Sequence, residues 1–378
     1  MGLQRLRRLG LVLALLALAA TLSGATPQAH AKSKVPELQF LGQAILPTGT
    51  SFANTQVGGL SGIAYDAGRN VFYTLSDDQG QINPARFYTL RIDVSAGPFD
   101  ATDVHFLAVT TLRGADGQPF PTGSLDPEGI AYTKAGTLVI TSEGFANQLV
   151  APWIRTFRLD GSQIGSLPVP APFLPAAGGT RGVRQNLAFE SATTAPNGRF
   201  LFSGTENALV QDGPAASVTA RSPSRLLCYN LQTGRLDRQY VYWTEPIAEP
   251  PVPSTAFAVN GLVDLLPLNN EFLLAMERSF SVGAPDTGNV IKLFSVKVAG
   301  ATNVNGVESL AGQLGTVRPV QKTLLLDLDT LGIPLDNVEG MAFGPTLPDG
   351  RRSLILVSDN NFAATQFTQF LLFAVAKS

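Results

Sequence analysis

Short apolar or alternating runs make up most of the chain, and Gly, Pro, Asn and Asp separate them. Runs of about five to nine residues with such punctuation are typical of β-strands, and helical periodicity is hard to find after the first 31 residues. The 37 Gly and 26 Pro residues fit a chain with many tight turns. The pattern predicts an all-β fold with many strands.

One hairpin pattern recurs five times. Each copy has a short apolar segment, a turn built on Ala-Gly, Asn-Gly, Asn-Asn or Asp-Gly, and a second apolar segment that ends in an acid. The copies are residues 60–78, 127–144, 189–207, 259–279 and 338–360, and their first polar positions lie 62 to 79 residues apart. Self-similarity at this period indicates a β-propeller or another array of blade-like units.

The segments between the copies supply further strands, so that each unit has four. In the first unit these are residues 87–93 and 103–112. The last unit ends after its third strand, and the alternating segment 37–47 can provide the missing fourth, which removes an exposed edge. We therefore predict a five-bladed β-propeller closed by pairing of the N-terminal strand with the C-terminal blade. A sixth, degenerate blade and a pair of β-sandwiches are the alternatives.

The first 31 residues have the layout of a secretory signal peptide. Three arginines precede an apolar run of about a dozen residues, and Ala29-His30-Ala31 forms a small-x-small cleavage signal. We expect residues 32–378 to form one exported propeller domain, periplasmic or extracellular, without a transmembrane segment. An uncleaved N-terminal anchor is the alternative.

Composition excludes several kinds of chemistry. Without Arg5, Arg7 and Arg8, the 27 basic residues fall to 24 against 29 acidic ones, and no basic run remains to bind nucleic acid. Cys228 has no second cysteine to pair with, so stability must come from a core rather than from an intramolecular disulfide. We expect a monomer. Only His105 remains after the signal peptide, and no Gly-x-Ser-x-Gly motif is present, so we expect His105 to be a strand residue without a catalytic role.

Acidic residues mark both ends of the repeated hairpin. The first strand of an antiparallel hairpin starts at the end where the second one finishes, and the first strand of a propeller blade lies nearest the channel. The marked positions should therefore converge on one mouth of the ring. The leading positions are Ser61, Glu128, Glu190, Asn260 and Glu339. The trailing positions are Asp77, Asp78, Glu143, Glu206, Glu277 and Asp359.

So many carboxylates at one opening need compensation, because a like-charge pair about 4 Å apart costs roughly 4 kcal/mol at an effective dielectric constant near 20. Raised pKa values, basic partners such as Arg181, Arg184 and Arg278, or a bound cation could provide it. Without spare histidine or cysteine, the cation would be a hard one, Ca²⁺ or Mg²⁺. The predicted metal ligands are Asp77, Asp78, Glu128, Glu143, Glu190, Glu206, Glu277, Glu339 and Asp359, with carbonyl oxygens from Asn186, Asn207, Asn260 and Asn337.

A purely structural role is the alternative for these acids. Carboxylates at strand ends often accept hydrogen bonds from turn amides, and a repeat copies such devices without giving them a function.

The same segments resemble the phytase-like family, the "esterase-like activity of phytase" proteins, whose members are exported bacterial proteins. The matching pieces include LSGIAYD, DPEGIAYTKAGTLVITSEG, FESATTAPNGRFLFSGTEN, FLLAMERSF and NVEGMAFGPTLPDGRRSLILVSDNNF, and they spread over roughly residues 56–376. Ser191 departs from the pattern, since the equivalent residues in other copies are Gly129 and Gly340. The resemblance implies a β-propeller and hydrolysis of esters or phosphate esters. A looser similarity to alkaline β-propeller phytases implies calcium, held by clustered carboxylates, that binds a substrate phosphate.

These observations together predict an exported hydrolase that acts on a small anionic or ester substrate with the help of Ca²⁺. The predicted catalytic residues are Glu128, Glu190, Glu339 and Arg278. The cation would neutralise substrate charge and activate water, and Arg278 would orient an anionic group. Two alternatives remain open: a non-catalytic propeller that binds a sugar, peptide or protein with structural calcium, and an envelope scaffold.

Overall fold

The computed structural model describes residues 37–95, 97–269 and 271–376. The chain divides into two units, Met1–Lys34 and Val35–Ser378, and all described residues belong to the second. The predicted signal peptide and its cleavage site lie outside the described residues. A search of the described helices found none long and apolar enough to cross a membrane.

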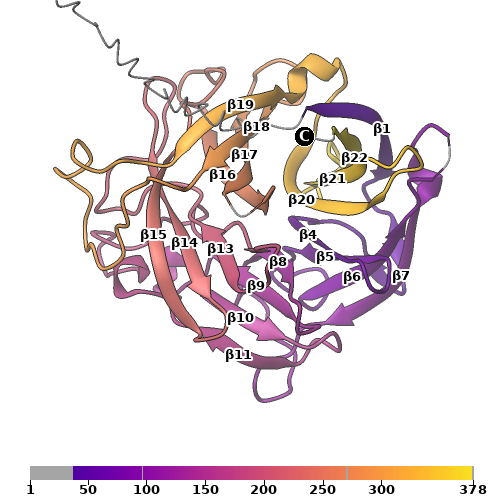
Figure 1. The fold of residues 1–378 in the computed structure, drawn as a ribbon, viewed down its shortest axis with the longest axis horizontal. Coiled ribbons are helices and arrows are strands. Elements are labelled where there is room, and N and C mark those ends of the chain that lie inside the picture. Colours follow the sequence, from indigo (N-terminus) through magenta and orange to yellow (C-terminus); the bar gives the residue numbers. More distant parts are fainter. Residues whose placement is uncertain (1–36, 96, 270, 377–378) are drawn as a thin grey trace, which may run out of the picture. The chain divides into compact units, whose positions relative to one another are not determined.

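Five four-stranded antiparallel sheets form the blades of a β-propeller (Figure 1). Counted from the channel outward, the first blade contains β4 (Gly62–Asp66), β5 (Val71–Ser76), β6 (Arg86–Ile92) and β7 (Val104–Thr111), and the second contains β8 (Pro127–Tyr132), β9 (Leu138–Ser142), β10 (Trp153–Phe157) and β11 (Gln163–Leu167). The third blade contains β12 (Thr193–Thr194), β13 (Phe200–Gly204), β14 (Pro223–Asn230) and β15 (Arg235–Trp243), and the fourth contains β16 (Ala258–Pro267), β17 (Phe272–Ser281), β18 (Asn289–Lys297) and β19 (Gln321–Asp327). The fifth blade contains β20 (Asn337–Thr346), β21 (Arg352–Asp359), β22 (Phe367–Val375) and β1 (Leu38–Pro47). The prediction of five blades is confirmed. The longest repeat interval contains a loop between β18 and β19 rather than a sixth blade.

The connections contain little regular structure. They include a small hairpin, β2 (Ser51–Phe52) with β3 (Thr55–Gln56), and four short 3₁₀ turns, η1 (Ala101–Asp103), η2 (Ala146–Gln148), η3 (Ala171–Phe173) and η4 (Leu328–Leu331). The blades therefore account for almost all the regular structure of the described residues.

The ring is closed by the first strand of the described chain. Strand β1 pairs antiparallel with β22, from Leu38 opposite Val375 to Pro47 opposite Phe367. This pairing covers the edge that β22 would otherwise expose, as the sequence predicted. The innermost strands β4, β8, β12, β16 and β20 each contact the next one around the channel, and β20 contacts β4.

Buried apolar side chains fill the spaces between neighbouring blades. One cluster joins the fifth and first blades and includes Ile355 and Phe72, and similar clusters join each other adjacent pair. Strands with both faces buried read as continuous apolar runs, which explains the sequence pattern. Cys228 is buried and unpaired within one cluster, whereas His105 lies exposed on the outermost strand β7.

Small residues follow the leading polar positions because the inner strands approach each other closely there. A Cβ atom on Gly129 would lie 2.5 Å from the carbonyl carbon of Ser191 and 2.5 Å from the amide nitrogen of Ala192. A Cβ atom on Gly62 would lie 2.6 Å from the carbonyl oxygen of Glu128. Backbone atoms cannot turn away as a side chain can, so these glycines fix the spacing around the mouth.

The substitution Gly129→Ala is therefore expected to destabilise the protein by about 1–3 kcal/mol, the usual cost of overpacking. Urea unfolding measures this loss. Gly165→Ala in the outermost strand of the same blade is the matched control, because its nearest neighbour would be Thr156 Cβ at 4.0 Å. Equal effects of the two substitutions would show that the close contact is unimportant.

Candidate active site at the acidic mouth

A cavity of about 980 Å³ opens at the end of the ring where the inner strands begin. All five blades contribute to its wall. Its acidic lining residues are Asp77, Asp126, Glu128, Glu190, Glu206, Asp286, Asp336, Glu339 and Asp359. Arg278 is the one lysine or arginine among the described residues that line it.

Two groups of three buried carboxylates lie at this cavity, and every member except Glu143 lines it. Oxygen atoms of Asp126, Glu128 and Glu143 lie within 4.8 Å of one another, and so do oxygen atoms of Glu143, Glu190 and Glu206. We call these five residues the acidic floor. Glu143 belongs to both groups and is therefore its centre.

Backbone contacts between the second and third blades fix the acidic floor. The amide of Glu143, just after β9, donates to the carbonyl oxygen of Asp126 at 3.0 Å. Its Oε1 accepts a hydrogen bond from the amide of Ala188, and the carbonyl oxygen of Ala188 accepts one from the amide of Glu206 at 2.7 Å. A Gln79 side-chain amide donates to Asp126 Oδ1 at 2.8 Å. The acids of both blades thus share one backbone anchor at Ala188.

Three oxygens of the acidic floor have no hydrogen-bond partner among the described residues: Asp126 Oδ2, Glu143 Oε2 and Glu206 Oε1. The three residues are only 1–2% exposed to solvent. A buried polar atom without a partner is costly, and a buried charge is more costly still. The arrangement therefore favours either bound protons or a cation at this place.

Burial dominates the titration of the acidic floor. It raises the pKa of Asp126 to about 6, that of Glu206 to about 7 and, with the nearby charge of Asp126, that of Glu143 to about 8. Burial also raises the pKa of Glu128 and Glu190 well above the usual range, and the neighbouring carboxylates add to both shifts. Without a cation, the floor retains protons near neutral pH.

A second pair of acids lies on the fifth-blade side of the mouth. Burial, together with Glu339, raises the pKa of Asp359 to about 8. Burial and the charge of Asp359 raise the pKa of Asp77 well above its usual range. Asp359 accepts hydrogen bonds from the side-chain amide of Asn337 at 3.2 Å and from the backbone amide of Asn361 at 2.6 Å. This pair extends the set of buried carboxyl groups across the opening.

Arg278 is the permanent positive charge of the mouth. Its Nη2 donates to Glu339 Oε1 at 2.8 Å and lies 3.8 Å from Glu206 Oε1. Burial lowers the pKa of Arg278, but Glu339 and Glu206 raise it more, so that the net shift is upward. Gly261 lies opposite Arg278 in the hairpin, and a Cβ atom there would lie 2.1 Å from Glu206 Cγ. A glycine at this position leaves the room that Glu206 occupies.

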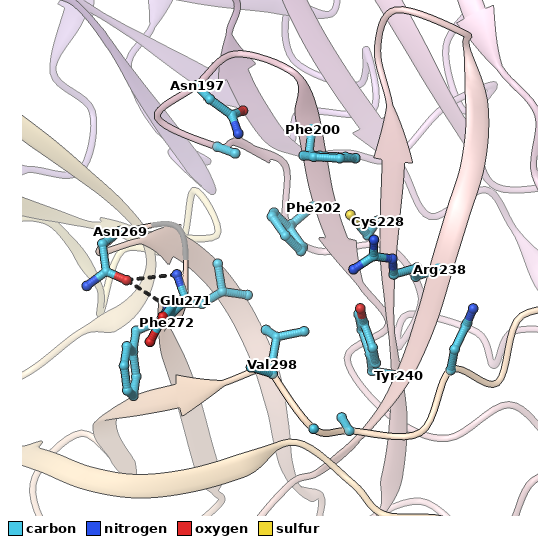
Figure 2. A pocket seen from close by; sticks show the side chains of 16 residues that line it. Asn197, Phe200, Phe202, Cys228, Arg238, Tyr240, Asn269, Glu271, Phe272 and Val298 are labelled. Carbon is cyan, nitrogen blue, oxygen red and sulfur yellow. Dashed lines mark hydrogen bonds between the residues drawn. The ribbon is translucent and has the colours of Figure 1, made fainter. Parts of the chain in front are cut away.

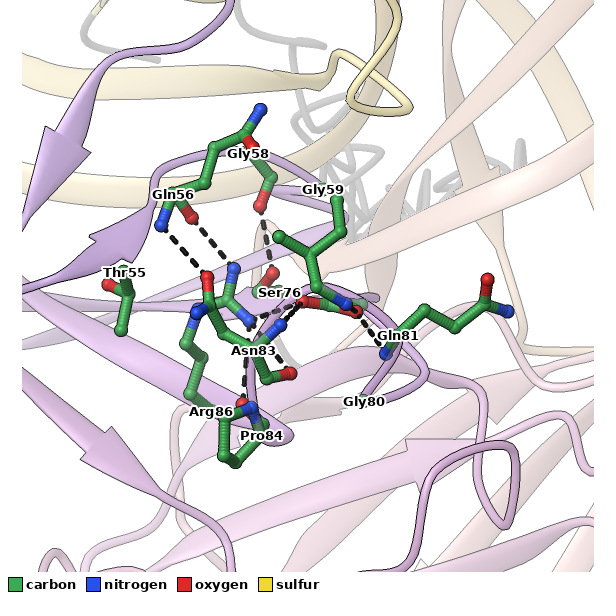
Figure 3. A network of polar contacts seen from close by, with 12 residues as sticks. Thr55, Gln56, Gly58, Gly59, Ser76, Gly80, Gln81, Asn83, Pro84 and Arg86 are labelled. Carbon is green, nitrogen blue, oxygen red and sulfur yellow. Dashed lines mark hydrogen bonds and ion pairs between the residues drawn. The ribbon is translucent and has the colours of Figure 1, made fainter.

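Two of the predicted metal ligands, Asp78 and Glu277, neither belong to the acidic floor nor line the cavity. Asp78 accepts a hydrogen bond from Arg86 Nη1 at 2.7 Å and others from the amides of Gln81, Ile82 and Asn83. Figure 3 shows Arg86 within this network, close to Asn83 and Gln56. Asp78 thus anchors the loop after β5, and Asp77 faces the mouth.

Glu277 likewise faces away from the cavity. Its Oε1 accepts hydrogen bonds from the Tyr242 hydroxyl at 2.7 Å and from Lys322 Nζ at 2.6 Å. Successive side chains of a strand point to opposite faces, so Arg278 occupies the mouth position that Glu277 leaves. The side-chain amide of Asn260 donates a hydrogen bond to Glu277 Oε2 at 3.0 Å.

Of the other polar residues predicted at the mouth, some lie beside it and others stabilise loops. Ser61 donates to the backbone carbonyl oxygen of Glu128 at 3.0 Å, beside the floor. Arg181 donates to the carbonyl oxygen of Ala171, and Arg184 to those of Ala208 and Gly213, so both stabilise loops instead of pairing with carboxylates. Asn186 and Asn337 line the cavity. The side chain of Asn207 donates to the carbonyl oxygen of Asn260 and accepts from the amide of Ala216, so it stabilises the backbone there.

Asp126 was not among the predicted site residues. It stands two residues before Glu128 in the DPEG segment, and residues two apart in an extended chain share a face. This spacing was the signal that could have identified it.

A second cavity, of about 440 Å³, lies between the third and fourth blades (Figure 2). It lies where strands β13 and β17 begin, at the opposite end from the acidic mouth. Phe200, Phe202 and Phe272 contribute to its walls, with Arg238 and Glu271 as the only charged residues among the described lining. It lacks converging carboxylates, so the acidic mouth is the stronger candidate for an active site.

The fold and this mouth define an all-β propeller with a buried carboxylate cluster at the start of its inner strands. A family model described as "Phytase-like: Esterase-like activity of phytase" matches residues 55–362, so the chain belongs to the phytase-like family. Membership of this family supports a hydrolase in general. A search of curated proteins found no match.

Solved structures resemble the chain only at the level of the fold. They include a tail fibre of Staphylococcus aureus phage P68 (TM-score 0.38, 9% identity, 90% of this chain and 53% of that one). An endo-arabinase from Bacteroides thetaiotaomicron has a TM-score of 0.39 and 11% identity over 88% of this chain and 97% of that one. A structure from work on GH130 glycoside hydrolases that target β-1,2 mannosidic linkages in Candida mannan has a TM-score of 0.46 and 10% identity over 88% and 94% of the two chains. The chain therefore spans about half the length of the phage protein and nearly all of the other two.

Proposed function

We propose that this protein is an exported hydrolase of phosphate or other esters and that calcium binds at the acidic mouth. The observation that carries the proposal is the set of three buried carboxylate oxygens of the acidic floor that have no hydrogen-bond partner among the described residues. Membership of the phytase-like family supports the hydrolase class.

The donor set fits a hard divalent cation. Asp126, Glu128 and Glu143 would hold one ion, and Glu143, Glu190 and Glu206 would hold a second or an alternative one. All are carboxylate oxygens, which Ca²⁺ prefers. A bound calcium ion would polarise a substrate oxygen and lower the pKa of a bound water molecule.

The side chains around the ion would handle protons and orient the substrate. Glu128 and Glu190 line the cavity, and burial raises the pKa of each, so the one that does not hold the ion would take up and return a proton. Arg278 lines the cavity, and its guanidinium would contact a developing negative charge. Glu339 would position Arg278 through their 2.8 Å contact.

Calorimetry with calcium and hydrolysis assays with an aryl phosphate, an aryl acetate and phytate test the proposal. We expect micromolar or tighter binding and hydrolysis of at least one substrate that stops when a calcium chelator is added. Calcium binding without turnover would favour the non-catalytic binding propeller. Neither binding nor turnover would favour the scaffold.

A further inference from the structure

One wall of the mouth is apolar, in contrast to its floor. Phe257 is 64% exposed, although large aromatic side chains are usually buried. Its ring lies 6.2 Å from that of Phe280, centroid to centroid, at an angle of 40°. Both rings line the cavity, and so do Leu187, Ala216 and Val259.

This aromatic wall adjoins Arg278 and the acidic floor. Phe280 lies two residues after Arg278 in β17, so the two side chains share a face of the strand. Phe257 immediately precedes β16, the strand that pairs with β17. A molecule held over the floor would therefore cover the exposed ring of Phe257, and burial of aromatic surface is favourable.

The negative charge of the mouth restricts the charge that a substrate can carry. Nine acids and one base line the described cavity, and that base already contacts Glu339 and Glu206. Two divalent cations would not balance the five carboxylates of the acidic floor, and Arg278 balances only Glu339. Asp286 adds a further negative charge, so the opening stays negative even without Asp77 and Asp359. Such a cavity repels a molecule that carries many phosphates, because like charges at this spacing are strongly unfavourable. An uncharged ester meets no such repulsion.

We propose that the mouth selects an uncharged carboxylic ester with an aromatic group, which packs on Phe257 and Phe280, and that it discriminates against polyphosphorylated substrates. This inference rests on the proposed function of the same site. In the reaction, the oxygen of a water molecule bonds to the acyl carbon and the bond to the alcohol oxygen breaks. A floor carboxylate takes one proton from the water and passes it to the departing alcohol oxygen, so that the products are the carboxylic acid and the alcohol.

Steady-state hydrolysis by the calcium-loaded protein tests the selection. Wild type is expected to hydrolyse 1-naphthyl acetate with a higher kcat/KM than phytate. Phe257→Ala is expected to raise the KM for 1-naphthyl acetate about tenfold with little change in kcat, and to leave the kcat/KM for ethyl acetate unchanged. Phe257→Tyr, which keeps a ring, should restore the low KM. Preference for phytate, or an unchanged KM in Phe257→Ala, would overturn the proposal.

A binding measurement separates this inference from the proposed function. The probe is N-(1-naphthyl)acetamide, an amide analogue, titrated calorimetrically into the calcium-loaded protein. About tenfold weaker binding by Phe257→Ala than by wild type supports the aromatic wall, even if no ester is hydrolysed and the proposed function fails. Equal binding by the two proteins, or displacement of the amide by phytate at equal concentration, contradicts the inference whatever the catalytic result.

Discussion

Glu143→Gln is expected to abolish calcium-dependent hydrolysis and to weaken calcium binding at least 100-fold. Glu143 is the one residue that both carboxylate groups of the acidic floor share. Loss of an outer-shell partner already lowers metal affinity by roughly 10–100-fold, so loss of a charged ligand should cost more. The amide oxygen of glutamine still accepts the hydrogen bond from Ala188, so the backbone anchor remains.

The same substitution should raise the melting temperature of the cation-free protein. It replaces a buried acid, with an unpartnered oxygen and a pKa of about 8, by a neutral group of the same size. Stability that rises while binding falls is the opposite of what general damage to the fold produces. Calorimetry and thermal unfolding in chelator measure the two effects.

Asp78→Asn is the matched control for Glu143→Gln. Asp78 is buried and acidic like Glu143, but it pairs with Arg86 outside the acidic floor. The control variant should lose stability, because Arg86 keeps a buried charge without its partner, and it should still bind calcium with the wild-type affinity. If Asp78→Asn lost calcium binding and Glu143→Gln kept it, the assignment of the floor would be wrong.

The cation-free protein is expected to become less stable as the pH rises from about 5 to about 8. In the unfolded chain, Asp and Glu side chains titrate near pH 4. In the folded protein, Asp126 keeps its proton up to about pH 6, Glu206 to about 7, and Glu143 and Asp359 to about 8. Between these limits the folded state binds more protons than the unfolded state, so the free energy of unfolding falls as the pH rises.

Each extra proton in the folded state corresponds to a loss of about 1.4 kcal/mol per pH unit. Calcium competes with these protons, so its stabilising effect should grow over the same range and its binding should release protons. Melting temperatures from pH 5 to 8, in chelator and in calcium, test both statements. A melting temperature in chelator that rises steadily across this range would contradict them.

The architecture was readable from the sequence because each blade repeats one local rule. An apolar segment, a turn of fixed chemistry and a second apolar segment ending in an acid define the inner hairpin, and segment 37–47 completes the count of strands. Local turns and alternation carry this information without any knowledge of neighbouring blades. Hence five blades and the ring closure could be predicted together.

The side of the strand that faces the mouth could not be read in the same way. At Asp77-Asp78 and at Glu277-Arg278, two adjacent residues are polar, and only one side chain of each pair can face the mouth. A shift of the strand register by one residue exchanges which of the two does so. The register in which Gly261 lies opposite Arg278 decides the second case. That register follows a bulge between Leu262 and Asp264, which only the paired strands reveal.

Strand β1 also sets the order in which the molecule can be completed. Leu38 must meet Val375, so the ring joins the two ends of the described chain and closes the longest possible loop of backbone. Contacts between such distant residues carry a large entropic cost and form slowly. Strand β1 cannot form this pairing until β22 has been synthesised, so the ring cannot close before the last described strand is made. A chain that crosses a membrane before this final pairing would do so without a closed ring to unfold.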